Sequence, residues 1–490
     1  MEQQQEGLFQ KIIAHAKEYG FVFPSSEIYD GLQAVYDYGQ NGVELKNNIK
    51  QAWWKTMTQL HDNIVGIDAA IFMHPNTWVA SGHVASFNDP MIDNKDSKKR
   101  YRVDHLLEGK ADQLTAEGKQ IEADALLRKM NDLLNANDFE ALRELIISEK
   151  IACPISGTVN WTEIRQFNLM FATQMGAVAQ DADTVYLRPE TAQGIFVNFL
   201  NVQKTGRMRI PFGIAQIGKA FRNEVVARQF IFRMREFEQM EMQFFVRPGT
   251  EMEWYNFWKE MRMKWHKAIG IPAEKLKFHD HEKLAHYANA ALDIEFEFPF
   301  GFKEVEGIHS RTDFDLGRHQ ELSKKKQQYY DNEVNKNYVP YVVETSVGAD
   351  RTFLMVLCNA YTEEIGKDAE GNEKIRTFLK LHPALAPIKA AIFPLVKKDG
   401  LPEVAQKIYN DLKLDFKVFY EEKDAIGKRY TRQDLIGTPF CIAVDHQTLQ
   451  DETVTIRYRD TTVQERVKIS ELRNIIEQEV SLKRIFEAIL

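Results

Sequence analysis

Residues 221–245, FRNEVVARQFIFRMREFEQMEMQFF, carry polar side chains at spacings that suit a binding face. We read the segment as two strands joined by a hairpin loop. Because side chains alternate along a strand, Arg222 and Glu224 share one face of the first strand, and Phe237 and Glu241 share one face of the second, while the methionines point the other way. An arginine pairs with anions, a glutamate accepts hydrogen bonds and a ring stacks. The same spacing equally fits a half-exposed hairpin with surface ion pairs.

A second segment, residues 339–361, reads as a strand, then Gly348, then an apolar helix with Arg351 in its first turn. A helix N-terminus favours anions, and the planar guanidinium fork matches phosphate oxygens. The alternative is an arginine that pairs with a nearby carboxylate. The sequence has no GxxxxGK[ST] loop and no GxGxxG after a strand, so a nucleotide would have to be bound in another way.

The bulk composition sets the class of protein. A chain of 490 residues exceeds a single core and indicates two or three domains, and 44% hydrophobic with 27% charged residues is typical of a soluble globular protein. Three scattered cysteines, no secretory signal and no run of about 18 apolar residues predict a cytoplasmic protein without a membrane span. The net charge of −8 gives no support to a nucleic-acid partner and does not exclude one.

The elements that must position these side chains fall into four blocks. Residues 1–94 mix helices and short strands. Residues 95–150 are charged, lack proline and predict a helical insertion of two amphipathic helices. Residues 151–380 mix strands and helices irregularly, which favours α+β, with a loop or linker at 361–373. Residues 381–490 alternate strand and helix, which predicts an α/β domain with a mainly parallel sheet.

Three short segments of the sequence resemble the signature motifs of class II aminoacyl-tRNA synthetases. FRNE…RMREF resembles motif 2, GADR resembles motif 3, and IVGIDAAIFMHPNTW resembles motif 1, which builds the dimer interface in that class. Further wording is similar to that of homodimeric glycyl-tRNA synthetases: WVASGHVASFND, RQFNLMF, LRPETAQGIFVNF, RTDFDL and AIGKRYTRQDLIGTPF. The resemblance implies an α+β class II catalytic domain with an antiparallel sheet, a C-terminal α/β anticodon-binding domain and a homodimer.

The resemblance also implies a two-step ligase reaction. The carboxylate of glycine attacks the α-phosphate of ATP, which gives glycyl-adenylate and pyrophosphate, and the terminal ribose of tRNA(Gly) then takes the glycyl group. This chemistry needs alignment and charge neutralisation rather than a protein nucleophile. By similarity, the catalytic residues are Arg222 and Arg351, and Glu304 helps to hold Mg²⁺ with ATP. The residues expected to bind ATP are Arg222, Asn223, Glu224, Phe232, Arg233, Phe237, Glu304, Val305, Gly348, Asp350 and Arg351.

Within the ATP set, the resemblance gives individual roles. Arg222 holds the α-phosphate, Glu224 accepts from the adenine amino group, and Phe237 stacks on the adenine ring. Arg233 and Arg351 reach the terminal phosphates.

A glycine site needs acceptors for the ammonium and a wall where a Cβ would project. Steric exclusion of larger amino acids then makes editing unnecessary. The resemblance places five residues there: Arg100, Glu190, Glu241, Glu344 and Ser346. Arg100 is matched to the arginine of the family's RxDHL phrase, and a basic run on a solvated edge is the alternative for it.

One departure from the family concerns metal. Many relatives carry a CPxCG zinc knuckle before the RQFNLMF phrase, whereas this chain reads CPISG, with Cys153 alone and Ser156 in the second cysteine position. Because a structural zinc site needs four ligands, we expect no structural zinc. His309 and His319 are expected to be structural residues.

In the C-terminal domain, Lys428, Arg429 and Arg432 either contact RNA phosphates or form a solvated helix face. Three other readings of the whole chain stand beside the glycyl one: a non-catalytic nucleic-acid-binding relative, a synthetase for another amino acid, and an interaction scaffold. The retained motif arginines argue against the first, and the TAQG, FEQME and ETSVGADR phrases against the second. The role of the helical insertion stays open.

Overall fold

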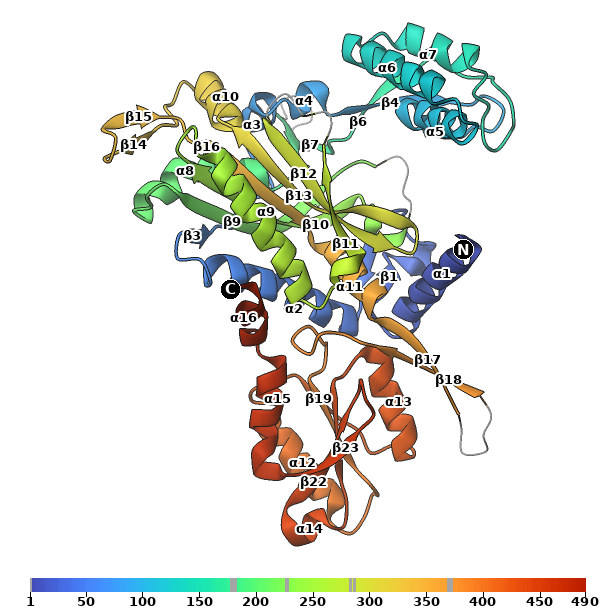
Figure 1. Ribbon diagram of the computed structural model, residues 1–490, viewed down its shortest axis with the longest axis vertical. Coiled ribbons are helices and arrows are strands. Elements are labelled where there is room, and N and C mark those ends of the chain that lie inside the picture. The colour runs from blue at the N-terminus through green and yellow to red at the C-terminus, as the bar shows by residue number, and fades with distance from the viewer. Residues whose placement is uncertain (1, 177–182, 225–228, 282–283, 285–287, 368–372) are drawn as a thin grey trace. The chain divides into compact units, whose positions relative to one another are not determined.

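The computed structural model describes residues 2–176, 183–224, 229–281, 284, 288–367 and 373–490 (Figure 1). The chain forms two compact units. The first comprises Met1–Ala70, Glu190–Ala220 and Gln229–Leu490, and the second comprises Ile71–Pro189 and Phe221–Arg228. Within the described part of the chain, no helix combines the length and apolar character that crossing a membrane requires.

A seven-stranded sheet forms the centre of the first unit. Its strands, in spatial order, are β11 (Leu276–Asp280), β12 (Ala290–Phe298), β13 (Gly301–Thr312), β16 (Tyr341–Gly348), β10 (Glu236–Val246), β9 (Phe212–Phe221) and β3 (Ile64–Gly66). The pairs from β11 to β10 are antiparallel, and β3 runs parallel to β9. The antiparallel sheet implied by the family resemblance is confirmed.

Helices pack on the sheet and share two cores with it. The helices of the larger core include α1 (Glu2–Glu18), α2 (Gln40–Thr58), α9 (Glu251–Ala268) and α11 (Ala349–Ala360), and those of the smaller core are α8 (Ala192–Thr205) and α10 (Phe314–Ser323). Met240, Met242 and Phe244 of β10 lie in the larger core, whereas Phe245 lies in the smaller one. The alternation expected for this strand is therefore confirmed from Met240 to Phe245, whereas Phe237 packs against the larger core. Figure 1 shows α9 lying along the sheet.

Short elements complete the part of this unit that precedes the C-terminal domain. They are β1 (Val22–Pro24), η1 (Glu27–Tyr29), β2 (Tyr36–Tyr38), η2 (Phe230–Phe232), η3 (Ala273–Lys275), β14 (Tyr329–Asp331) and β15 (Lys336–Tyr338).

The loop predicted at 361–373 is wrong over its described residues. They belong to an antiparallel hairpin of β17 (Tyr361–Lys367) and β18 (Glu373–Leu379). Two cross-strand pairs favour the hairpin over a loop. Ile365 faces Ile375, and Glu364 forms an ion pair with Arg376 at 3.1 Å.

The C-terminal domain has a five-stranded sheet in the order β20-β19-β21-β22-β23. Its elements are β19 (Ala390–Pro394), α12 (Leu401–Leu412), β20 (Val418–Tyr420), α13 (Ile426–Ile436), β21 (Phe440–Val444), α14 (Thr448–Asp451), β22 (Thr453–Tyr458), β23 (Gln464–Lys468) and η4 (Ile469–Glu471). The three strands of the predicted βαβαβ order are parallel, but β21, β22 and β23 pair antiparallel. The sheet is thus mixed rather than mainly parallel, because the connections to β22 and β23 are too short for parallel crossovers.

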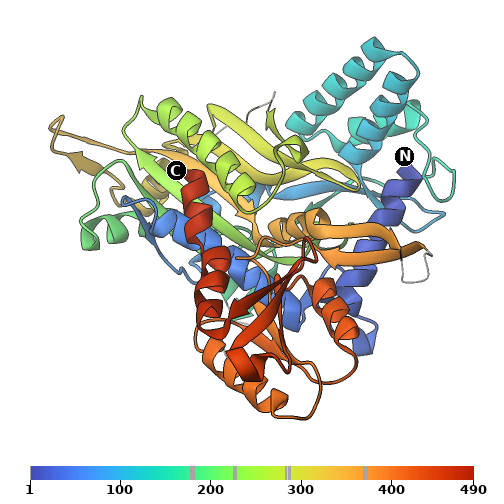
Figure 2. The ribbon, with the colours of Figure 1, turned by 60° about the horizontal axis from the view of Figure 1, so that its bottom comes forward.

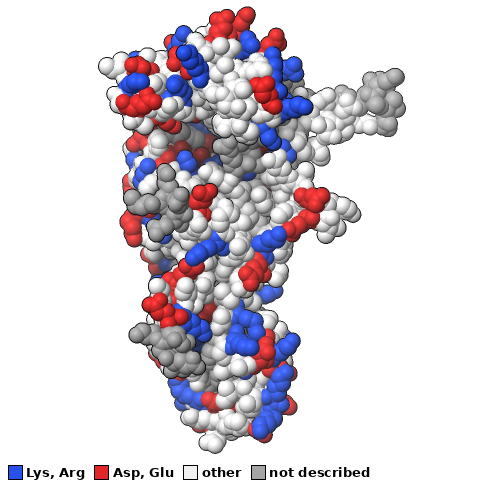
Figure 3. Space-filling view, turned by 90° about the vertical axis from the view of Figure 1, so that its right-hand side faces the viewer, with Lys and Arg blue, Asp and Glu red and all other residues white. Residues whose placement is uncertain are grey.

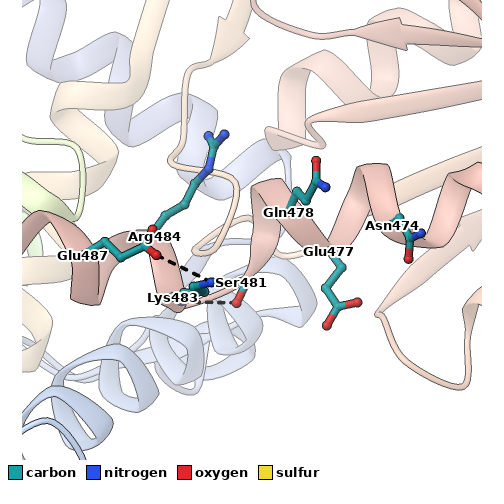
Figure 4. A pocket seen from close by; sticks show the side chains of 7 residues that line it. All are labelled: Asn474, Glu477, Gln478, Ser481, Lys483, Arg484 and Glu487. Carbon is teal, nitrogen blue, oxygen red and sulfur yellow. Dashed lines mark hydrogen bonds and ion pairs between the residues drawn. The ribbon is translucent and has the colours of Figure 1, made fainter.

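Two helices end the chain, α15 (Leu472–Val480) and α16 (Lys483–Ile489). Ile485 and Ile489 of α16 are buried in the larger core, where α16 packs against α9 (Figure 2). A shallow depression of about 450 Å³ lies along the junction of the two helices and is lined by polar side chains such as Glu477 and Arg484 (Figure 4). There Ser481 caps the N–H of Lys483 at 3.2 Å.

The second unit contains the helical insertion. Its elements are α3 (Pro75–Ala80), α4 (His83–Ser86), β4 (Asn88–Asp93), β5 (Arg100–Arg102), α5 (Val103–Ala116), α6 (Gln120–Ala136), α7 (Phe139–Ser148), β6 (Arg165–Asn168), β7 (Ala172–Met175) and β8 (Asp183–Tyr186). The insertion has three helices, not the two predicted, because Gly118 takes a left-handed φ of +78° and ends the first. Its core reaches Trp161, beyond the helices.

Charged side chains of both signs are interspersed over the face drawn in Figure 3. The net charge of −8 is therefore not gathered into one acidic patch on that face.

Candidate functional site

Two neighbouring strands bring together three of the residues predicted to bind glycine. In the antiparallel register of β10 and β16, Glu241 lies opposite Ser346, and Gln243 lies opposite Glu344. On the next strand, His309 of β13 lies opposite Glu344. Glu241 and Gln243 share a face, so the two carboxylates and the serine line one polar strip of the sheet.

The start of α8 supplies a further part of this strip. The Thr191 hydroxyl donates to the Glu241 carboxylate, and the Thr191 N–H donates to the side-chain oxygen of Gln239 at 3.1 Å. The Gln193 amide donates to Glu190 and to Asp315, each at 3.0 Å. Glu190, also predicted from the sequence, is thereby held beside the buried acids.

Arg311 is the buried cation of the cluster, and a β-bulge places it there. Ser310 and Thr312 pair with two consecutive residues of β16, so Arg311 is the extra residue between them. Its guanidinium contacts both oxygens of Asp315 at 2.8 and 3.1 Å and both oxygens of Glu344 at 3.2 Å. One cation therefore serves two of the acids.

The two central carboxyls differ in charge state. Burial, then the charges of Glu344 and Glu190, raise the pKa of Glu241 to about 8. Burial opposes ionisation of Glu344 as well, but Arg311 and then His309 outweigh it and lower the pKa of Glu344 to about 2. Glu344 is thus an ionised, paired carboxylate, and Glu241 is the member of the cluster that a cationic ligand would ionise.

Further along the sheet, Arg351 lies in the first turn of α11, as predicted. Its guanidinium carbon stands 4.4 Å from the centre of the Phe232 ring, its Nε donates to the Phe232 carbonyl at 3.2 Å, and its Nη1 pairs with Glu304 at 2.9 Å. The alternative of an arginine paired with a carboxylate is therefore what the structure contains, and the partner is itself a predicted ATP and Mg²⁺ residue. The structure thus brings Arg351, Phe232 and Glu304 together.

A second bulge in β13 places Glu304. Glu304 pairs with Glu295 and Glu306 pairs with Ile294, which makes Val305 the extra residue. Val305 is 1% exposed and lies in the larger core, so its side chain faces the protein interior. The Glu304 side chain is 48% exposed.

The remaining predicted ATP residues of this unit lie on three elements. Arg233 directly follows η2, Phe237 lies near the start of β10 against the larger core, and Gly348 is the N-cap of α11. Asp350 is 3% exposed, and its carboxylate is engaged by protein donors.

Arg222, Asn223 and Glu224 belong to the second unit. The strand predicted to reach Glu224 is wrong in its end point, because β9 stops at Phe221, so the expected strand alternation does not apply to these residues. The Arg222 Nε donates to the Pro189 carbonyl at 3.1 Å. The middle of the predicted loop, residues 225–228, lies outside the described residues.

Arg100 also lies in the second unit, where it forms a bidentate ion pair with Asp93 at 2.7 and 3.0 Å. In the chain's own RVDHL phrase the arginine is Arg102, not Arg100, so the match proposed for Arg100 was misplaced by two residues. Arg102 is half-buried and pairs with Asp89 and Asp104.

The CPISG turn is held by hydrogen bonds. The Cys153 sulfur lies 3.3 Å from the Ser97 hydroxyl and 3.2 Å from the Tyr101 hydroxyl, and Ser156 donates to Asn94 at 2.9 Å. Among the described residues, no group of three or more His, Cys, Asp or Glu side chains is arranged to hold a metal ion. His309 bonds Glu344 at 2.9 Å, and His319 lies 2.8 Å from the Gln193 side-chain oxygen.

The three basic residues of α13 differ from one another. Arg429 is 1% exposed and donates to the carbonyls of Pro394, Glu421 and Leu395, so neither alternative considered for it, an RNA contact or a solvated face, applies. Arg432 pairs with Glu421 and Asp424, whereas Lys428 is exposed.

Replacing Arg429 by Met is expected to lower the free energy of unfolding by about 1–3 kcal/mol, because buried carbonyls lose their donor. Lys428→Met, one residue away on the surface, is the matched control and should leave the melting temperature unchanged. Calorimetry of both variants checks this. Equal stability of the two proteins would contradict the structural role of Arg429.

The sequence did not predict several members of the acidic cluster around Glu241 and Glu344. These are Thr191, Gln193, Gln243, Arg311 and Asp315. The RTDFDL phrase carried a usable signal, because its arginine and second aspartate lie four residues apart. The bulge that turns Arg311 inward has no such signal in the sequence.

Comparison with known proteins first defines the class. The family described as "tRNA synthetase class II core domain (G, H, P, S and T)" matches residues 173–360, "Anticodon binding domain" matches 389–479, and "Glycyl-tRNA synthetase insertion domain 1" matches 89–125 and 116–169. The fold is similar to a crystal structure of prolyl-tRNA synthetase from Cryptosporidium parvum complexed with halofuginone and AMPPNP, with a TM-score of 0.58 and 12% identity over 97% of this chain and 78% of that one. The protein is a class II aminoacyl-tRNA synthetase.

The particular family follows from three curated relatives, each named glycine--tRNA ligase. The protein from Chlorobaculum tepidum is 55% identical over 94% of this chain and 97% of its own length, that from Macrococcus caseolyticus 52% over 96% and 98%, and that from Treponema denticola 50% over 96% and 97%. The chain belongs to the glycine--tRNA ligase family. It activates glycine with ATP and transfers it to the 3′ end of tRNA(Gly).

Proposed function

We propose that the strip on β10 and β16 is the glycine subsite of this ligase, with Glu190, Glu241 and Glu344 around the ammonium and Ser346 beside it. The observation that carries the proposal is the charge balance. Arg311 is shared by Asp315 and Glu344, and Glu241 is 2% exposed with its pKa raised to about 8. A buried carboxyl among other acids binds a cation well, because the cation restores the favourable charge balance.

Arg222 and Arg351 are the proposed catalytic residues. The glycine carboxylate oxygen forms a bond to the α-phosphorus, and the bond from that phosphorus to the bridging oxygen breaks, with the electron pair leaving on pyrophosphate. Arg222 neutralises the α-phosphate, while Arg233 and Arg351 receive the charge that grows on the leaving pyrophosphate. Arg351 exchanges its contact with Glu304 for phosphate oxygens.

The adenosine part of ATP is assigned to the other predicted residues. Phe237 stacks on the adenine ring, and Glu224 accepts a hydrogen bond from the adenine amino group. The Phe232 ring packs against the Arg351 guanidinium. The backbones of Asn223, Val305 and Gly348 line the same nucleotide. We do not assign Arg100 to the glycine subsite, because its guanidinium is paired with Asp93 and the arginine of the RVDHL phrase is Arg102.

Glu304 is the proposed protein ligand for Mg²⁺. The donor set fits, because Mg²⁺ in such sites takes one or two carboxylates and completes its shell with substrate phosphates and water. The half-exposed Glu304 carboxylate suits this role, and the absence of a preformed cluster of three acids, histidines or cysteines in the described residues is compatible with it. When bound, Mg²⁺ supplies positive charge to the phosphate oxygens.

We further propose that the ligase acts in the cytoplasm as a homodimer, with the segment that resembles motif 1 at its interface. Residues of this segment form β3 and α3. Sedimentation of the purified protein tests the dimer, and a monomer at micromolar concentration would contradict it.

Glycine binding is expected to release a proton near pH 7, and this tests the glycine subsite. Glu241 is largely protonated below its pKa of about 8 in the free protein, and an ammonium beside it favours the ionised form. The KM for glycine should therefore fall up to about tenfold per pH unit as pH rises from about 6 toward 8, and then level off. Titration calorimetry in buffers of different ionisation enthalpy measures the released proton. No proton release and a flat KM would overturn the assignment of Glu241.

A further inference from the structure

Asp350 lies in the first turn of α11, directly before Arg351, and its carboxylate is committed to donors from three other elements. The Lys46 ammonium of α2 donates to it at 2.6 Å, the Glu238 N–H of β10 donates at 2.7 Å, and the Tyr38 hydroxyl of β2 donates to the same oxygen as Lys46. At 3% exposure, this carboxylate faces protein rather than an open site.

Lys46 is the centre of the network. It is 5% exposed, and its Nζ bridges Asp350 at 2.6 Å and Glu238 at 2.8 Å while it stands 4.1 Å from the centre of the Tyr38 ring. Burial alone would lower the pKa of Lys46, but Asp350 and then Glu238 outweigh burial and raise it. The buried group is therefore a charged ammonium between two carboxylates.

Both carboxylates are chain neighbours of residues assigned to ATP. Asp350 precedes Arg351, and Glu238 follows Phe237. Because its donors hold the Asp350 carboxylate in place, they also fix the position of the N-terminus of α11. From there Arg351 reaches the Phe232 ring and Glu304. Figure 1 labels the two elements that Lys46 joins, α2 and α11, and they pack directly on each other. Lys46 thus connects the chain next to Phe237, the proposed adenine contact, with the chain next to Arg351, the proposed phosphate contact.

We propose that Lys46, Tyr38 and Asp350 are positioning residues for ATP activation, which hold Arg351 and Phe237 in register without touching the nucleotide. The inference rests on the proposed roles of Arg351 and Phe237. It replaces the expectation that the Asp350 side chain binds ATP with a role through Arg351. Lys46 lies about 300 residues before Arg351 in the chain, so only the fold connects them.

Lys46→Met tests the proposal, and Lys50→Met is its matched control. Lys50 lies one turn later on α2 and reaches Glu238 at 3.1 Å. We expect Lys46→Met to raise the KM for ATP and lower kcat/KM for ATP about 10- to 100-fold in glycine-dependent ATP–pyrophosphate exchange, because small displacements of aligned groups are costly to rate. The KM for glycine should change less than about threefold, and Lys50→Met should stay within about threefold of the parent protein in both.

Two further variants keep the test decisive. Tyr38→Phe removes one hydroxyl and should fold, with a rise in the KM for ATP of about three- to tenfold, and Lys46→Arg should recover part of the loss because it restores the charge. If Lys46→Met is unfolded, Tyr38→Phe decides. A lowered melting temperature with unchanged ATP kinetics in Lys46→Met, or in Tyr38→Phe where that variant decides, would overturn the positioning role. If Arg351→Ala itself keeps full exchange activity, the proposed function fails instead.

Discussion

Arg351→Ala is expected to lower kcat for glycine-dependent ATP–pyrophosphate exchange by about 10²- to 10³-fold. A preorganised donor aimed at developing charge contributes this much in a low-dielectric site. Arg351 is held in place by the Phe232 ring and the Phe232 carbonyl, so its guanidinium only has to exchange Glu304 for phosphate oxygens. The loss should be in kcat more than in the KM for glycine, because Arg351 contacts Phe232 and Glu304 rather than the acidic residues of β10 and β16.

Arg318→Ala is the matched control for that experiment. Arg318 is an exposed arginine of the same unit that pairs with Glu321 on α10 at 3.0 Å. A surface ion pair of this kind contributes little to stability, so the variant should keep full exchange activity. Similar activities of the Arg351 and Arg318 variants would contradict the catalytic role of Arg351.

Glu241→Gln is expected to raise the KM for glycine and lower kcat/KM for glycine by about 10²- to 10³-fold, equivalent to about 3–4 kcal/mol, because one partner of a buried charge pair is removed. The glutamine keeps the shape of the side chain and can still bond Thr191, but it carries no charge for the ammonium. Because Glu241 has a raised pKa in the free protein, removal of its charge should not destabilise the fold.

Three measurements separate a lost glycine contact from a damaged protein. The melting temperature of Glu241→Gln should match that of the parent, and its affinity for a non-hydrolysable ATP analogue should be unchanged. Glu333→Gln, which removes an acid whose side chain is 83% exposed, should leave the KM for glycine as it was. If the Glu241 variant also lost binding of the ATP analogue, Glu241 would have a role in the fold rather than in glycine binding.

The sequence allowed the fold class to be predicted, and also the direction of the β10 side chains where strand alternation decides it. Met240 and Met242 turn into the larger core, and Glu241 turns away from it, as the period of two requires. Alternation failed at Arg222 and Glu224, since nothing in the FRNE letters marks the end of β9 at Phe221. The half-exposed hairpin is also excluded, because β10 is a central strand buried on both faces from Gln239 to Val246.

The other misses share a physical cause, which is tertiary context. Two bulges on β13 aim Arg311 and Glu304, and a bulge is set by pairing with neighbouring strands rather than by local residue type. Asp350 and Arg429 read as polar helix residues, yet both are buried by partners far away in the chain. The pattern of neighbouring residues in the sequence identifies such residues as polar. It does not determine whether they face a ligand or the protein interior.

We propose that the acidic strip on β10 and β16 makes this class II synthetase a glycine enzyme. ATP–pyrophosphate exchange with each of the twenty amino acids, at one concentration and pH, tests it most directly. Glycine should support the highest rate, and alanine, which adds only a methyl group, should support far less, because a subsite fitted to glycine leaves no room for a Cβ. Faster exchange with any other amino acid than with glycine would contradict the account.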